Sequence, residues 1–217
     1  MRSLLHLRES DMNQSDPLID MTHGAGGKNM HRLIQNVFAK ILGNEHLKEK
    51  HFYHSPPKGK LVITTDSHVV SPLFFPGGDI GSLSMHGTLN DLAVMGAKPL
   101  YLTSAMILEE GFAFRDLEKI VLSMAQVQNQ SGVPIVTGDT KVVERGKCDG
   151  IYITTTGVGV LPTERQELHP RRIAVGDHIL VNGTLGDHGV AIMASRFDLK
   201  FANPLLSDSC SLHFLIK

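Results

Sequence analysis

Three aspartates in this 217-residue chain stand where predicted strands or helices end. Asp66 ends a short β-branched run, Asp91 lies late in a predicted helix, and Asp139 directly follows a buried apolar run. Carboxylates brought together from separate elements suit Mg²⁺, whose remaining positions are filled by phosphate oxygens and water. The sequence therefore predicts a metal site formed by these three carboxylates.

A glycine-rich segment, Gly24-Ala25-Gly26-Gly27-Lys28, precedes the first predicted helix. Its free backbone N–H groups and the positive end of that helix form a site suited to phosphate. Lys28 and Lys141 could neutralise further phosphate charge. The segment is not a Walker A loop, because Thr22 stands where that motif needs glycine and Asn29 where it needs a hydroxyl. Together with the aspartates, it predicts a nucleotide–metal site.

Each of these features also has an ordinary structural interpretation. A glycine segment before a helix is often a tight turn, and an aspartate after a strand, such as Asp66 or Asp139, is often a turn or cap residue. Asp79 fits a helix N-cap. Asp91 and Lys141 could be solvated surface charges. The functional interpretation is favoured because three aspartates and a glycine segment recur at the same kind of position.

Hydrophobic spacing predicts the elements that position these residues. Apolar residues between positions 30 and 42 follow the period of one buried helix face, and Gly43 closes that helix. The other predicted elements are a strand at 61–65, a helix from the N-cap Asp79 to about Gly96, a strand at 101–108, a helix from 114 to about Gly132, and strands at 133–137, 151–161 and 178–181. This order suits helices on one sheet in an α+β fold as well as a parallel α/β sheet.

Composition excludes several classes of protein. The net charge is −1, no basic stripe occurs, and the chain has no tryptophan, so a nucleic-acid partner is not expected. No stretch approaches the roughly 18 apolar residues needed to span a bilayer. Cys148 and Cys210 are far apart and are expected to be free thiols. With no signal-peptide pattern near Met1, the sequence predicts a cytoplasmic protein without membrane association.

Several long motifs occur in order along the chain, at residues 23–28, 65–70, 72–81, 87–97, 107–111, 136–143 and 183–189. In this order they resemble the motifs of the HypE family of hydrogenase maturation factors. HypE belongs to the PurM-like, AIR synthase-related superfamily of ATP-binding enzymes, with selenophosphate synthetase and thiamine monophosphate kinase. The resemblance extends from Met21 to about Cys210.

The resemblance implies an α+β fold. Residues 1–20 would be a flexible segment, and residues 21–170 a PurM-like domain whose mixed or antiparallel sheet has helices on one face and completes a β-barrel across a homodimer. Residues 171–217 would begin a second domain, with ATP bound between the two. The resemblance assigns Mg²⁺ to Asp66, Asp91 and Asp139, and the nucleotide to Gly24, Gly26, Gly27, Lys28, Asn90 and Lys141.

The resemblance also implies a reaction. A HypF-like carbamoyltransferase would place a carbamoyl group on a C-terminal cysteine. ATP would phosphorylate the oxygen of that group, and loss of phosphate would leave a thiocyanate. The cyano group would then pass to a HypC–HypD-like complex and become a cyanide ligand of the iron in [NiFe]-hydrogenase.

The chain departs from the family pattern at its end. It stops at Lys217 without the family's C-terminal cysteine, and Cys210 falls in a stretch that resembles an internal family segment, where we expect a packed small residue. We therefore expect a shortened form or a piece of a longer protein. Two alternatives remain open, which are another phosphoryl-activating enzyme of the superfamily and a non-catalytic module for dimerisation or partner binding.

Overall fold

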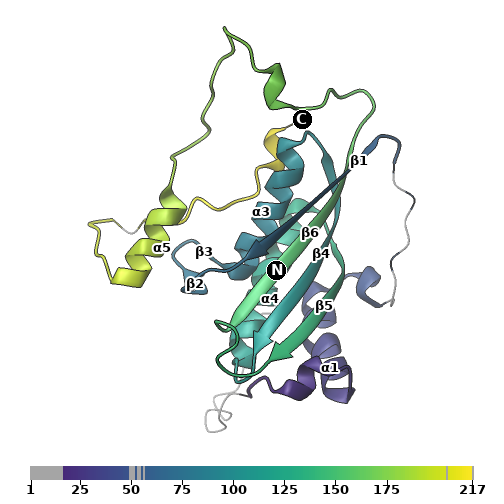
Figure 1. The fold of residues 1–217 in the computed structure, drawn as a ribbon, viewed down its shortest axis with the longest axis vertical. Coiled ribbons are helices and arrows are strands. Elements are labelled where there is room, and N and C mark those ends of the chain that lie inside the picture. The colour runs from purple at the N-terminus through teal and green to yellow at the C-terminus, as the bar shows by residue number, and fades with distance from the viewer. Residues whose placement is uncertain (1–16, 49–51, 53–54, 56, 204, 217) are drawn as a thin grey trace, which may run out of the picture.

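The computed structural model describes residues 17–48, 52, 55, 57–203 and 205–216 (Figure 1). The strands are β1 (Lys60–His68), β2 (Phe74–Phe75), β3 (Gly78–Asp79), β4 (Lys98–Glu109), β5 (Ile135–Val143) and β6 (Ile151–Leu161). The helices are α1 (Lys28–Leu33), α2 (Lys40–Leu42), α3 (Ile80–Val94), α4 (Phe114–Ser131) and α5 (Asp187–Phe197). A π-helix, Ile34–Ala39, joins α1 to α2, and short 3-10 turns occur at Met21–Gly24, Glu45–Lys48, Pro170–Arg172 and His213–Leu215.

Four strands form one mixed sheet in the order β1-β6-β4-β5. The β1–β6 and β6–β4 pairs are antiparallel, whereas β4 and β5 are parallel. Helices α3 and α4 lie together on one face of this sheet (Figure 1). The predicted α+β class is therefore confirmed, and the parallel α/β alternative is excluded.

The hydrophobic core lies between the sheet and the two long helices. Side chains alternate along β6, so that every second residue from Ile151 faces the helices and is buried. Fully buried residues include Met85, Leu89, Leu102, Ile120, Met124 and Ile153. Burial of each such side chain contributes about 1.5–3 kcal/mol to folding.

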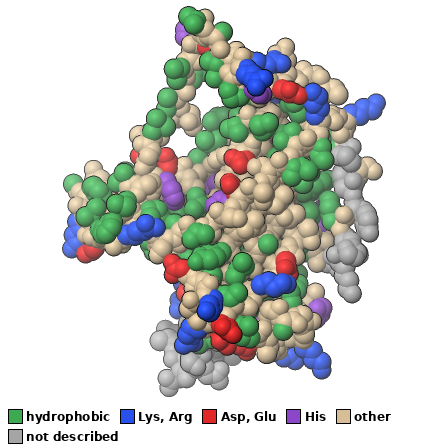
Figure 2. Space-filling view, viewed as in Figure 1, with side chains coloured by type: hydrophobic (Ala, Val, Ile, Leu, Met, Phe, Trp, Pro, Cys, Tyr) green, Lys and Arg blue, Asp and Glu red, His purple; other side chains and the backbone are tan. Residues whose placement is uncertain are grey.

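The opposite face of the sheet is open. Leu61 and Ile63 of β1 are 57% and 61% exposed, and Ile107 of β4 is 40% exposed. Their neighbours on this face include several threonines, and Figure 2 shows few charged side chains over the strands. The face is therefore mildly apolar and mostly uncharged.

The predicted helix ends are confirmed where local chemistry fixes them. Gly43 and Gly132 close α2 and α4 in the left-handed conformation, with φ of 60° and 70°. Asp79 caps α3, since its Oδ1 accepts from Ser82 N at 2.9 Å and its own N–H bonds to Ser82 Oγ at 3.0 Å. Burial raises the pKa of Asp79 despite these bonds. Capping thus accounts for this aspartate.

Three predictions about strands are wrong. The strand expected at 61–65 is β1, Lys60–His68, so Asp66 lies within a strand rather than at its end, because pairing with β6 continues to His68. The strand expected at 133–137 is β5, Ile135–Val143, so Asp139 lies within a strand rather than after one. Parallel pairing with β4, in which Asp139 opposes Ala105, extends the strand through the polar residues. No strand forms at 178–181, where Ile179 and Leu180 are 94% and 89% exposed and pair with no described strand.

Residues 162–203 lead away from the sheet, and residues 205–216 come back to helix α3 rather than to a strand. Helix α5 lies beside β2, and residues 205–216 then run back along α3 (Figure 1). Ser207 N donates to Pro76 O at 2.8 Å at the start of this return. Among the described helices, none is long and apolar enough to cross a membrane.

Candidate functional site

Asp66 and Asp91 converge where β1 packs against α3. Asp91 Oδ2 accepts a hydrogen bond from Thr64 Oγ1 at 2.8 Å. Asp66 is two residues further along the same face of β1, and lies opposite Gly87, one helical turn before Asp91. A Cβ at Gly87 would lie 3.4 Å from Asp66 Oδ2 and 2.9 Å from His68 Nε2. A side chain at this position would therefore require the His68 ring to shift, so glycine favours the close approach of helix and strand.

His68 is a neighbour of this site that sequence reasoning did not single out. Its Nε2 lies 4.0 Å from Asp66 Oδ2, and its side chain is only 11% exposed. Burial lowers the pKa of His68, although the charge of Asp66 opposes this shift. The imidazole is therefore neutral near pH 7. The alternation of β1 is the signal that could have found it, because residues 64, 66 and 68 share one face.

Asp139 lies elsewhere in the single chain. It is on β5, which β6 and β4 separate from β1, and it faces the open side of the sheet with Ala105. Lys141 Nζ bonds to Asp139 Oδ2 at 2.9 Å, and both side chains are more than half exposed. Within the described residues, no three or more His, Cys, Asp or Glu side chains cluster as a metal site would require. One chain thus brings two of the three predicted carboxylates together.

The glycine loop, residues 24–28, lies at the β5 edge of the sheet. A Cβ at Gly24 would meet Val142 N at 2.4 Å, so only glycine permits this contact. Gly26 has a φ of 78°, a conformation that favours glycine. Gly27 forms the N-cap of α1, and Lys28 begins the helix with an exposed side chain. The glycine loop and Asp139 therefore lie at the same edge of the sheet, opposite the edge that carries Asp66.

Asn90 has partners that the sequence did not predict. Its Nδ2 donates to Cys210 O at 2.9 Å, and its Oδ1 accepts from Leu212 N at 2.7 Å. Both ends of the amide therefore bind main chain of residues 205–216, and a phosphate contact would require one of these bonds to open. Cys210 is exposed rather than packed, which corrects the expectation for this side chain.

One turn before Asn90, His86 also binds the returning segment. Its Nδ1 lies 2.7 Å from Ser211 Oγ. Burial, with a smaller effect from His213, lowers the pKa of His86 to about 4. Helix α3 thus uses one face for Asp91 and another, with His86 and Asn90, to hold residues 205–216.

The pair of carboxylates fits a magnesium–nucleotide site. Mg²⁺ is commonly held by one or two carboxylates together with substrate phosphates and water. Asp66 is 44% exposed, so an ion and its water could reach it. The arrangement can therefore bind a hydrated divalent cation whose other ligands come from phosphate.

The sheet and the helices α3 and α4 match one known family. The model of the family described as AIR synthase related protein, N-terminal domain, matches residues 48–161, just over half of the 217 residues. This chain belongs to that family. The match includes Asp66, Asp91 and Asp139 but not the glycine loop.

Curated relatives narrow the resemblance to HypE and confirm it. The chain is 53% identical over 208 residues to the carbamoyl dehydratase HypE of Cupriavidus necator, covering 94% of this chain and 59% of that protein. It is 42% identical over 208 residues to the Escherichia coli carbamoyl dehydratase HypE, covering 92% and 61%. The chain thus spans about three-fifths of the length of the relatives it matches.

Solved structures agree with these relatives. A HypE structure in complex with ATP superposes with a TM-score of 0.87 at 43% identity, covering 91% of this chain and 59% of that one. HypE from a HypE–HypF complex gives 0.70 at 47% identity, covering 85% and 60%. A thiamine-monophosphate kinase from Stenotrophomonas maltophilia gives 0.57 at 24% identity, covering 76% and 52%, which supports the fold alone.

Proposed function

We propose that this chain is the nucleotide-binding part of an ATP-dependent carbamoyl dehydratase that acts in [NiFe]-hydrogenase maturation in the cytoplasm. The observation that carries the proposal is 53% identity to the Cupriavidus necator carbamoyl dehydratase over nearly the whole chain. The similar HypE structure that binds ATP supports the nucleotide.

The proposed reaction removes water from a carbamoyl group carried by a cysteine thiol. Phosphorylation of the carbamoyl oxygen by ATP converts it into a leaving group, and loss of phosphate and a proton leaves the S–C≡N product. Asp66 and Asp91 would hold Mg²⁺, which would offset the charge of the transferred phosphoryl group. Lys28 and the glycine loop would bind phosphate oxygens.

The proposal includes protein partners. A structure of a HypE–HypF complex supports a HypF-like carbamoyltransferase as the source of the carbamoyl group. A HypC–HypD-like complex would receive the cyano group, which would become a cyanide ligand of iron. These partners would meet regions of the whole enzyme that include more than this chain.

A homodimer would reconcile the two separate parts of the site. The sheet order puts Asp66 on one edge strand and Asp139 on the other. If the open faces of two subunits close into one β-barrel, β5 of one subunit can lie beside β1 of its partner. Each site would then combine the glycine loop, Asp139 and Lys141 of one subunit with Asp66 and Asp91 from the partner.

Calorimetric titration with ATP, with and without Mg²⁺, tests the proposed function. We expect Mg²⁺-dependent binding that Asp66→Asn and Asp91→Asn each weaken at least about tenfold, since each removes one charged ligand. Asp149→Asn, at an exposed position in the β5–β6 connection, is the matched control and should bind as the original chain does. Absence of ATP binding by the original chain would contradict the proposal.

Mixed dimers test the shared site. Asp66→Asn and Asp139→Asn subunits would each form dimers with no intact site, but a dimer of one with the other would regain one complete site. We expect each mixed dimer to bind one ATP, which is half of what a dimer of the original chain would bind. No restoration in isolated mixed dimers would mean that the site lies within one subunit or that Asp139 has no part in it.

A further inference from the structure

A pair of buried hydroxyl groups joins helix α3 to the interior strand β6. Thr155 Oγ1 donates to the main-chain oxygen of Ser84 at 3.0 Å, and the Thr88 hydroxyl is hydrogen-bonded to the same Thr155 oxygen. All three residues are fully buried. Because the Thr155 proton goes to Ser84, the Thr88 hydroxyl is the donor of the second bond. We call Thr88, Thr155 and the Ser84 oxygen the hydroxyl bridge.

The hydroxyl bridge lies beside the two carboxylates of the candidate site. Thr155 pairs with Asp66 of β1 in the antiparallel register, and both side chains are on the helix-covered face. On α3, Thr88 directly follows Gly87, which faces Asp66, and stands three residues before Asp91. The bridge therefore links α3 to the strand next to β1 within one helical turn of Asp91.

Helix α3 approaches the sheet closely around the bridge. A Cβ at Gly157 of β6 would lie 2.8 Å from Thr88 Cγ2 and 2.9 Å from Leu92 Cδ1. The remaining contacts of this interface are mainly apolar, and apolar contacts have no preferred direction. They hold the helix against the sheet but restrict its sliding along the strands only weakly. The hydroxyl bridge adds a directional contact that fixes the position of α3 along β6.

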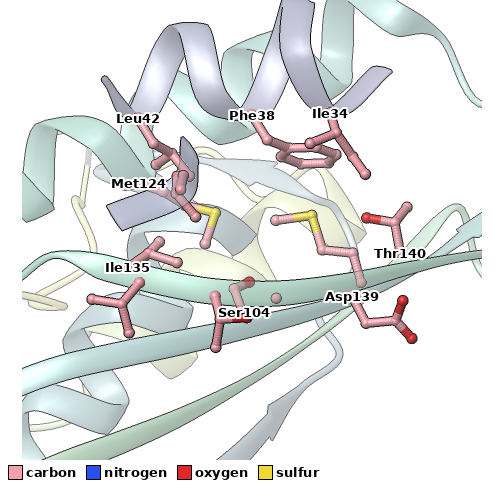
Figure 3. A pocket seen from close by; sticks show the side chains of 13 residues that line it. Ile34, Phe38, Leu42, Ser104, Met124, Ile135, Asp139 and Thr140 are labelled. Carbon is pink, nitrogen blue, oxygen red and sulfur yellow. The ribbon is translucent and has the colours of Figure 1, made fainter. Parts of the chain in front are cut away.

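Ser104 of β4 provides a contrast in the same row of the sheet. It pairs with Thr155 and is only 7% exposed, yet its hydroxyl has no hydrogen-bond partner among the described residues. Figure 3 shows Ser104 in a pocket that Met124 and Phe38 also line. Of these two neighbouring hydroxyls, only the one beside Asp66 is bonded to a helix.

The position of α3 determines the spacing of the two carboxylates. Asp91 is on the helix and Asp66 is on the strand, so their separation changes whenever α3 shifts on the sheet. Mg²⁺ requires near-ideal octahedral geometry, with ligands at about 2.0–2.1 Å. We infer that Thr155 is a positioning residue, which through the hydroxyl bridge keeps Asp91 at the distance from Asp66 that the cation requires. This inference rests on the proposed use of both carboxylates as Mg²⁺ ligands.

Thr155→Val tests the inference, because it removes the hydroxyl and nearly keeps the shape of the side chain. The measured quantity is the gain in ATP affinity when Mg²⁺ is added, obtained by calorimetry. We expect this gain to fall about tenfold, as when an outer contact of a metal ligand is lost, while ATP binding without Mg²⁺ stays within about twofold. Thr155→Ser keeps the bridge, so it should retain the gain, although the lost methyl group lowers its unfolding midpoint.

Ser84→Ala is the matched control that separates positioning from stability. It removes a buried hydroxyl of the same helix, which donates to Gly81 O at 2.8 Å, but it leaves the main-chain oxygen that accepts from Thr155. Ser84→Ala and Thr155→Val should each lower the unfolding midpoint by about 2–4 °C, as expected for one lost hydrogen bond. Only Thr155→Val should lose the gain from Mg²⁺. If both variants lose it equally, or neither does, Thr155 has only a structural role and the inference is overturned.

Titration with Mn²⁺ in the absence of nucleotide distinguishes this inference from the proposed function. Bound Mn²⁺ broadens nearby NMR signals, so the amide signals of Thr64 and Gly87 should broaden in the original chain and in Ser84→Ala, but much less in Thr155→Val. Equal broadening in Thr155→Val would overturn the inference.

The two experiments together separate the possible failures. If the Mn²⁺ pattern appears but ATP does not bind or gains nothing from Mg²⁺, the inference stands and the proposed function fails. If Mg²⁺ strengthens ATP binding equally in the original chain and in Thr155→Val, only the inference fails. If neither Mn²⁺ nor ATP binds, both fail.

Discussion

Residues 60–161 and residues 162–216 differ in how they are held in place. The first region buries its apolar side chains between one sheet and two helices, with Ile120 and Leu89 fully buried. In the second, Ile173 and Ile179 are 75% and 94% exposed, and hydrophobic side chains gather on α5 and the connection before it (Figure 2). The first region therefore has its own core, whereas the second depends on contacts with other surfaces.

This difference between the two regions affects the carboxylate site formed by Asp66 and Asp91. Asp66 and Asp91 are fixed by elements that the core of the first region holds rigid. The second region reaches the same helix through the polar contacts of His86 and Asn90. The carboxylates should therefore keep their geometry when the second region moves.

Truncation of a core side chain should give the largest effect. If it does not lower the stability, the difference between the two regions is disproved. Ile120→Ala should lower the free energy of unfolding by about 2–5 kcal/mol, because it leaves a cavity in the core of the first region. Ile179→Ala, the matched change in the second region, should alter it by no more than about 0.5 kcal/mol. Urea unfolding measures both. Equal losses would show that the second region has a core of its own.

The pH dependence of stability should show a smaller effect at His86. Its pKa is about 4 in the folded chain and about 6.5 when unfolded, so between these values the unfolded state binds more protons. Stability should therefore be complete above pH 6.5 and fall by about 2 kcal/mol as the pH drops toward 4. Urea unfolding at several pH values should show a shallower fall in His86→Gln. Identical profiles would contradict this assignment.

The smallest effect is expected at the hydrogen bonds that join the second region to helix α3. Asn90→Ala removes two hydrogen bonds to residues 210–212, which should reduce the protection of the Leu212 amide by about 1–2 kcal/mol in hydrogen exchange. Amides of β4 and β6 should change little, and Asn36→Ala, at an exposed position, should leave Leu212 unaffected. Loss of protection throughout the sheet would show that the two regions unfold together.

Sequence reasoning succeeded where neighbours along the chain decide the outcome. The caps at Gly43, Asp79 and Gly132 depend on one or two adjacent turns, and the β-branched run of β6 forms a strand through its own pattern. The overall α+β class followed from the family resemblance, since periodicity left two classes open. The two converging carboxylates were also proposed from the sequence.

The remaining features depend on contacts between distant residues. The side of the sheet that Asp139 faces is set by its register with β4, and no local pattern encodes that register. Asn90 meets Cys210 and Leu212 about 120 positions away, so its partners could not be inferred from its own helix. The expected strand at 178–181 has high β propensity but no partner, and a strand without hydrogen-bonded neighbours does not persist.

The pairing of β1 with β6 determines when the carboxylate site can form during synthesis. Thr64 pairs with Gly157 and Asp66 with Thr155, so β1 has to wait for about 90 further residues to leave the ribosome. Until then Leu61 and Ile63 remain on an unpaired strand, which is a surface that chaperones bind and that favours aggregation. The order of translation thus makes Asp66 one of the first site residues synthesised and one of the last to reach its final position.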